Sequence, residues 1–152
     1  MGTPTTQFLL FGFCIALVPG LFAQNPDPGD PRHEYLGELR GQVATFNYDS
    51  VLDKALKKDP IALAHLFRLG ALDGAGAEAH SQVLWALLFR WGDSSYAAVL
   101  RAEPDSVRKR IGCNLDSAAG FTYANQFPAT FKAVTHNPTC RDWKKGCCLT
   151  CA

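Results

Sequence analysis

The chain has 152 residues, of which 47% are hydrophobic, a composition that is ordinary for a globular protein. Its 15 lysines and arginines nearly balance 14 aspartates and glutamates, so the formal net charge is only +1. Nucleic-acid binding usually requires a clear basic excess, and we therefore expect no nucleic-acid partner.

The first 23 residues predict a secretory signal peptide. No charged side chain precedes Asp27, and a continuous apolar run extends over Phe8–Val18. Pro19–Gly20 ends that run, and Ala23 is the small residue after which we expect cleavage. An uncleaved anchor is the alternative, but Phe8–Ala23 is shorter than the roughly 20 residues that a spanning helix needs. We expect a secreted or periplasmic protein with no membrane span after cleavage.

The rest of the chain divides by composition into three parts. Residues 24–38 alternate prolines with Asp and Gly, which is typical of an extended linker because proline donates no backbone hydrogen bond. Residues 39–134 carry helical patterns and are expected to form one domain. Residues 135–152 form a Cys-rich tail.

Two helices are predicted in the first half of this domain. Ser50 followed by Asp53 is close to a capping box and predicts a helix start. Asp59 followed by Pro60 predicts the next start, because aspartate caps helices and proline suits the first helical position. Gly74 is the expected stop. The second helix should bury Ile61, Leu63, Leu66, Phe67 and Leu69.

The most apolar segment is Ala77–Trp91, which is hydrophobic around most of a helix circumference. Such a helix belongs at the centre of a bundle. Gly92 should end it, and Asp93 should cap the following helix. A further short helix is expected over Pro104–Gly112. At helical spacing, we expect the aromatic residues of this region to be core residues; they are Phe67, Trp85, Phe89, Trp91 and Tyr96.

The predicted fold class is all-α, because no segment shows the strict alternation of a strand. Leu63–Gly70 and Trp85–Gly92 share Ala, Leu, Phe, Arg and Gly at matching positions, including Arg68 and Arg90. Stacked helical hairpins produce such repetition, but two amphipathic helices of similar composition produce it as well. The sequence therefore predicts a small helical bundle or a short stack of helical hairpins.

Four segments together resemble a group of exported bacterial helical proteins that have no assigned activity. The resemblance extends over Ile61–Phe131, and the cysteine tail departs from it. It implies bacterial export and no particular chemistry. The segments are "DGAGAEAH", "WGDSSYAAVL", "DSVRKRIG" and "FPATF".

Catalytic and cofactor-binding patterns are missing from the sequence. His65 stands alone among apolar residues, and Glu78 and His80 are two apart, so they diverge on a helix. No pair of histidines has the four-residue spacing of a zinc helix, and no Gly-x-Ser-x-Gly elbow or phosphate loop occurs. We therefore predict no cofactor and a non-catalytic protein.

The cysteines are the remaining candidates for chemistry. Five follow the signal peptide, and an exported location favours disulfides among them. Adjacent cysteines cannot pair without strain, so Cys147 and Cys148 should reach different partners. An odd number leaves one thiol, which would join either a second chain, as in a disulfide-linked dimer, or a thiol cofactor. The disulfide candidates are Cys113, Cys140, Cys147, Cys148 and Cys151.

Metal binding by the tail is the alternative. Cys148 and Cys151 have the two-residue spacing that lets two thiolates hold one ion, and Cys140 and Cys147 would complete four ligands. Thiol redox chemistry requires a helix after the Cys-x-x-Cys pair, and only Ala152 follows Cys151.

Together these observations predict an exported, non-catalytic helical module that binds a protein partner of the cell envelope or has a structural role. The alternative is a metal-binding or thiol-redox protein that acts through its cysteine cluster. An enzyme with an unfamiliar site is a third class.

Overall fold

A computed structural model describes residues 29–30, 39, 46–70, 72, 74–119 and 123–134. The predicted signal peptide, most of the predicted linker and the cysteine tail lie outside these residues. In the described part the secondary structure is helical and contains no strand, which confirms the all-α prediction. The helices are α2 (Tyr48–Leu56), α3 (Pro60–Arg68), α4 (Gly74–Trp91), α5 (Asp93–Arg101), α6 (Asp105–Ala119), α7 (Tyr123–Gln126) and α8 (Pro128–Ala133).

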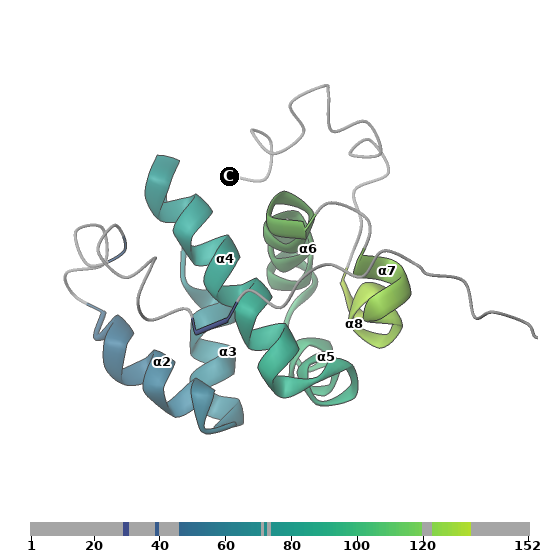
Figure 1. The fold of residues 1–152 in the computed structure, drawn as a ribbon, viewed down its shortest axis with the longest axis horizontal. Helices are drawn as coiled ribbons and strands as arrows, with labels where there is room; N and C mark the ends of the chain where they lie inside the picture. The colour runs from purple at the N-terminus through teal and green to yellow at the C-terminus, as the bar shows by residue number, and fades with distance from the viewer. Residues whose placement is uncertain are drawn as a thin grey trace, which may run out of the picture.

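Helix α4 runs through the middle of the molecule, with α2 and α3 on one side and α6 on the other (Figure 1). Its most extensive contact is with α6, α2 packs mainly on α3, and α5 packs mainly on α8. Helix α3 also contacts α5 and α6. In a linear stack each unit would touch only its neighbours in the sequence. These longer-range contacts make the described part a bundle.

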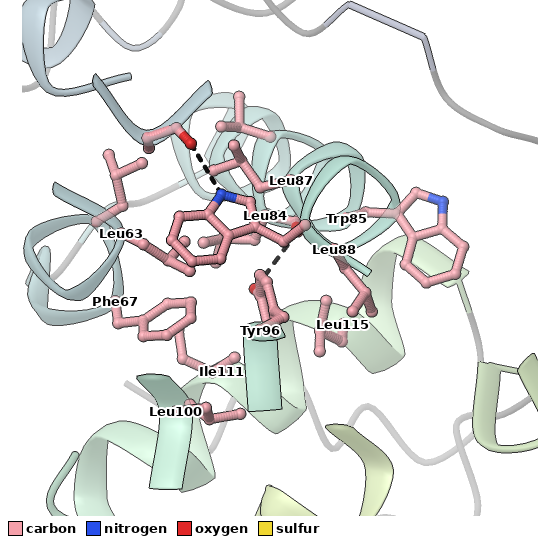
Figure 2. Packing of buried hydrophobic residues seen from close by; sticks show 14 of the residues in the cluster. Leu63, Phe67, Leu84, Trp85, Leu87, Leu88, Tyr96, Leu100, Ile111 and Leu115 are labelled. Atoms are coloured by element: carbon pink, nitrogen blue, oxygen red, sulfur yellow. Dashed lines mark hydrogen bonds between the residues drawn. The ribbon is translucent and has the colours of Figure 1, made fainter. Parts of the chain in front are cut away.

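The central position of α4 agrees with its sequence, because apolar side chains cover most of its circumference. Figure 2 shows leucines of α4 directed toward residues of α3, α5 and α6, whereas the Trp85 ring points away from this group. The Tyr96 hydroxyl of α5 donates a hydrogen bond to the Leu84 carbonyl of α4 at 3.4 Å. The buried hydrophobic residues of α4 are Ala79, Val83, Leu84, Trp85, Ala86, Leu87, Leu88 and Trp91.

The predicted start of α3 is confirmed, and the predicted cap of α2 at Ser50 is wrong by three residues. Asp59 Oδ1 accepts from the backbone N–H groups of Ile61 and Ala62, at 2.9 and 3.2 Å. In α2 the cap is Asn47, whose side chain accepts from the Ser50 N–H at 3.2 Å. Asparagine caps as well as serine does, so the earlier residue starts the helix.

Three further predictions about these helices are wrong. Ile61 is 68% exposed, because it lies on the outer face of α3, opposite the buried Leu63 and Leu66. Helix α3 ends at Arg68, and Gly74 is the first residue of α4. Helix α6 continues through Gly112 to Ala119. Glycine costs a helix only about 1 kcal/mol, which the packing of α6 on α4 outweighs.

Asp93 was expected to cap α5, but its carboxylate caps α8 instead. Asp93 is the first residue of α5, and the N-cap position is Gly92, at a φ of 76°. The two Asp93 oxygens accept from the backbone N–H groups of Ala129 and Thr130, both at 2.7 Å. The Thr130 hydroxyl donates to the Asp93 carbonyl at 3.3 Å. These bonds fasten the start of α8 to the start of α5.

Helix α2 ends in a Schellman motif built around a lysine. The Asp59 N–H donates to the Lys54 carbonyl at 3.1 Å, and the Lys58 N–H donates to the Ala55 carbonyl at 2.9 Å. Lys58 has a φ of 64°, in the left-handed region that favours glycine. The motif therefore carries backbone strain at a residue with a side chain.

We expect Lys58→Gly to stabilise the protein by about 1 kcal/mol, because glycine adopts this φ without a steric penalty. The neighbouring Lys57 is also exposed but has a φ of −87°. Lys57→Gly should lower the free energy of unfolding by up to about 0.5–1 kcal/mol. Urea unfolding of both variants checks this pair, and a shift of the same sign in both would contradict the strain at Lys58.

Asp93→Ala should destabilise the protein by about 1–2 kcal/mol, because two backbone N–H groups of α8 lose a charged acceptor. Asp105→Ala is the matched control. Asp105 is also in the first turn of its helix, but it makes an exposed pair with Arg108 at 3.0 Å, which contributes little. Urea unfolding measures both, and equal losses would show that the contact with α8 contributes nothing specific.

Candidate functional site

The buried polar side chains are the first place to look for a reaction centre. Four polar or charged residues of the described part are buried as whole residues, and each of these four is hydrogen-bonded within the protein. Ser81 Oγ donates to the Ala77 carbonyl one turn earlier in α4, at 2.9 Å. The others connect different helices, so their chemistry is used to hold elements together. The buried polar residues are His80, Ser81, Glu103 and Thr130.

His80 of α4 and Tyr48 of α2 form a buried pair. The Tyr48 hydroxyl and His80 Nδ1 are 2.8 Å apart, and the two rings meet edge to face at a centroid distance of 5.9 Å. His80 also has a hydrogen bond to the Leu66 backbone in α3. A carbonyl only accepts, so we assign the ring proton to the nitrogen facing Leu66, and the Tyr48 hydroxyl as donor to Nδ1.

Both members of this pair are held in their neutral forms. Burial lowers the pKa of His80 to about 4; the hydrogen bond to Leu66 opposes this shift, and the charge of Arg110 adds to it. Burial raises the pKa of Tyr48 far above its ordinary value. A general base needs a pKa near the working pH and access to a substrate, and buried His80 has neither.

Arg68 at the end of α3 forms a bidentate ion pair with Glu103, which follows α5. Arg68 Nε and Nη2 donate to the two carboxylate oxygens at 2.7 and 2.9 Å. The Glu103 side chain is 1% exposed, whereas that of Arg68 is 56% exposed. The hydrogen bond and charge of Glu103 raise the pKa of Arg68, so the guanidinium stays charged. The arginine thus neutralises a buried carboxylate from the solvent side.

Two helix ends receive donors from other helices. Arg110 Nη2 of α6 donates to the Phe67 carbonyl near the end of α3, at 2.9 Å. Trp91 Nε1 at the end of α4 donates to the Ala55 carbonyl near the end of α2, at 2.8 Å. The Phe67 carbonyl thereby gains a donor from outside its helix, and the cation of Arg110 suits the helix dipole. The Ala55 carbonyl, which already accepts from the Lys58 N–H, gains a second donor. These two bonds fix the position of α6 against α3 and of α4 against α2.

Aromatic rings join α4 to the C-terminal helices. The Trp85 ring meets those of Phe89 and Phe127 edge to face, at centroid distances of 4.8 and 5.6 Å. Tyr123 of α7 lies 6.3 Å from Trp85 and 5.4 Å from Phe131. The expectation that the aromatic residues form core is confirmed for Trp85, Trp91, Tyr96 and Phe67, and Phe89 is half-buried.

The predicted cysteine site falls almost entirely outside the described residues. Cys113 is half-buried on α6 and is not a free thiol. Cys140, Cys147, Cys148 and Cys151 lie outside the described part, so their disulfide pairing and their metal binding stay predictions. Within the described part, no group of three or more His, Cys, Asp or Glu residues could hold a metal ion.

The other sequence candidates are separated in space. His65 is exposed on α3, and Glu78 is exposed on α4 while His80 is buried, as their two-residue spacing predicted. The Tyr48–His80 pair was missed. The available signal was that His80 precedes Val83 and Leu84 by three and four residues, which places it on a core face of α4.

Comparisons with known proteins found no relative whose function could be compared with this geometry. No family model, no curated protein and no solved structure shows a significant match to the chain. Among the described helices, none is both long and apolar enough to span a membrane.

We expect Arg68→Ala to lower the melting temperature by several degrees, because the buried Glu103 carboxylate loses its neutralising partner. Arg90→Ala is the matched control: Arg90 occupies the equivalent position in the last turn of α4 and is exposed. Calorimetry should show a clearly smaller change for it. Equal shifts would mean that only the helix dipole, common to both arginines, matters.

Stability should fall as the pH drops from 6.5 toward 4. His80 has a folded pKa of about 4 and an unfolded pKa near 6.5, so the unfolded chain binds more protons in this window. At pH 4 the loss from this residue is on the order of 3 kcal/mol. Urea unfolding at several pH values should show a shallower dependence in His80→Gln than in the wild type. Parallel curves would exclude His80 as the cause.

Proposed function

We propose that the chain is an exported, non-catalytic helical module that binds a protein partner of the cell envelope or has a structural role there. The proposal rests on what the four buried polar residues of the described part do. Three of the four connect helices, and the fourth bonds its own helix. A rigid helical body without a committed reaction centre suits the presentation of a surface.

The proposed export rests on the sequence. Residues 1–23 have the apolar run, helix break and small residue of a secretory signal, and residues 24–38 are a proline-rich linker between it and the folded domain. The likeness of Ile61–Phe131 to exported bacterial helical proteins supports the same compartment. We therefore place the protein in the periplasm or outside the cell.

In such an oxidising compartment, disulfides are the best use of the tail. Cys113 belongs to α6, the helix most extensively packed on α4, so a bond from Cys113 to the tail would anchor residues 135–152 on the core. Five cysteines cannot all pair within one chain, and the remaining thiol would link a second copy. The alternative function is metal binding or thiol redox chemistry by the same cysteines.

Secretion of the full chain from an exporting host, followed by alkylation and mass spectrometry with and without reduction, tests the proposal. We expect a mature N-terminus near Gln24, at most one alkylated thiol before reduction and no bound metal. Five alkylated thiols together with bound zinc would establish the metal-binding alternative. An intact Met1 in a membrane fraction would contradict export as a cleaved protein.

Two variants separate the tail from the helical body. Deletion of residues 135–152 removes the tail, and replacement of Cys113 by Ser removes its proposed anchor on α6. Both variants should keep the helical circular dichroism spectrum. If partner binding depends on the helical body, cross-linking to a purified envelope partner should survive in both. Loss of cross-linking in both variants, with the helical spectrum retained, would assign binding to the tail instead.

A further inference from the structure

Helix α2 is joined to α4 by two polar links of different chemistry. At its end the Ala55 carbonyl accepts from the indole of Trp91, which does not titrate. At its start the Tyr48 hydroxyl bonds His80 at 2.8 Å, and both residues are buried, at 2% and 3% exposure. Only the link at the start of α2 contains a group whose charge changes in mildly acidic solution.

Protonation removes the acceptor on which that link depends. Neutral His80 offers Nδ1 as a lone-pair acceptor to the Tyr48 hydroxyl. In the imidazolium both ring nitrogens are donors, so the Tyr48 hydroxyl would have to turn and accept, which leaves its own hydrogen directed into apolar surroundings. A buried group without a hydrogen-bond partner is costly.

The groups around His80 do not compensate a positive charge. Tyr48 faces it from α2, the Leu66 backbone from α3 and the cationic Arg110 from α6. Tyr48 cannot supply a negative charge, because burial raises the pKa of its hydroxyl far above the ordinary value. Burial raises the pKa of Tyr96 in the same way, so Tyr96 also stays neutral. Leu66 accepts a hydrogen bond but carries no net charge. In this setting the imidazolium gains no opposite charge and is repelled by Arg110.

Apart from these two links, α2 is attached mainly to the helix that follows it in the chain. Helix α2 packs mainly on its neighbour α3, and its contact with α4 is small beside that of α6. The remaining helices are fastened to each other by links that do not involve α2, among them Asp93 to α8 and Arg68 to Glu103. Loss of the Tyr48–His80 bond therefore weakens one attachment and leaves the rest of the bundle connected.

We propose that the start of α2 is an acid-released flap: protonation of His80 breaks its bond to Tyr48, detaches the start of α2 from α4 and uncovers the apolar side of α4 there, while α5, α6 and α8 stay folded. Release at the start of α2 would expose the core positions that Tyr48 and Leu52 cover, both of which are buried in the closed form. The inference goes beyond the proposed function and does not depend on it.

Hydrogen exchange with mass spectrometry on the full chain tests the proposal, with rates corrected for the intrinsic effect of pH. Between pH 7 and pH 4.5, protection of the 48–56 amides should fall about 50-fold, the ratio that follows from the two histidine pKa values. Amides of α5 should keep their protection. Equal losses in α2 and α5 would indicate global unfolding, and unchanged α2 protection would exclude release; either result would overturn the proposal.

His80→Gln should make α2 protection nearly independent of pH, and His65→Gln, at an exposed histidine of α3, should respond as the wild type does. An acid response in His80→Gln like that of the wild type would overturn the proposal. If His80→Gln does not fold, the wild-type chain still decides: NMR titration of the His80 ring nitrogens should follow the loss of α2 protection. Opening of α2 at a pH where the ring remains neutral would contradict the mechanism.

Discussion

The burial of α4 on nearly all sides is the constraint on which the rest of the structure depends. On the buried faces of this helix a polar side chain cannot reach water, so each polar group there needs a partner from a neighbour or from its own backbone. His80 finds Tyr48, Ser81 bonds the preceding turn, and the indole of Trp91 finds the Ala55 carbonyl. The bonds of His80 and Trp91 set the position of α2 along α4.

The outer helices are fixed by a different device, in which a charge meets the end of a helix or an opposite charge. Asp93 supplies the acceptors for the start of α8, and Arg110 supplies a donor for the end of α3. Short helices such as α8 are marginal by themselves, so a charged cap from another helix has a large share in holding them. The short helix α8 is therefore stabilised mainly by its neighbours.

The role of the buried polar residues in joining helices bears on function. Among the described residues, three of the four buried polar residues connect separate elements of the bundle, and Ser81 bonds its own helix. Of these connections, the one between Tyr48 and His80 contains a histidine, and under our proposal the attachment of α2 is sensitive to acid at this bond.

The sequence by itself determined the helical class, the cap at Asp59 with Pro60 as the first helical residue, and the central place of Ala77–Trp91, because these depend on local periodicity and local hydrogen bonds. The signal peptide and the cysteine pairing stay predictions from the same sequence. Only the tertiary structure decided that α6 continues through Gly112, that Asp93 caps α8 and that His80 meets Tyr48. Each joins residues far apart in the chain or depends on packing that outweighs local propensity, and no local pattern contains that information.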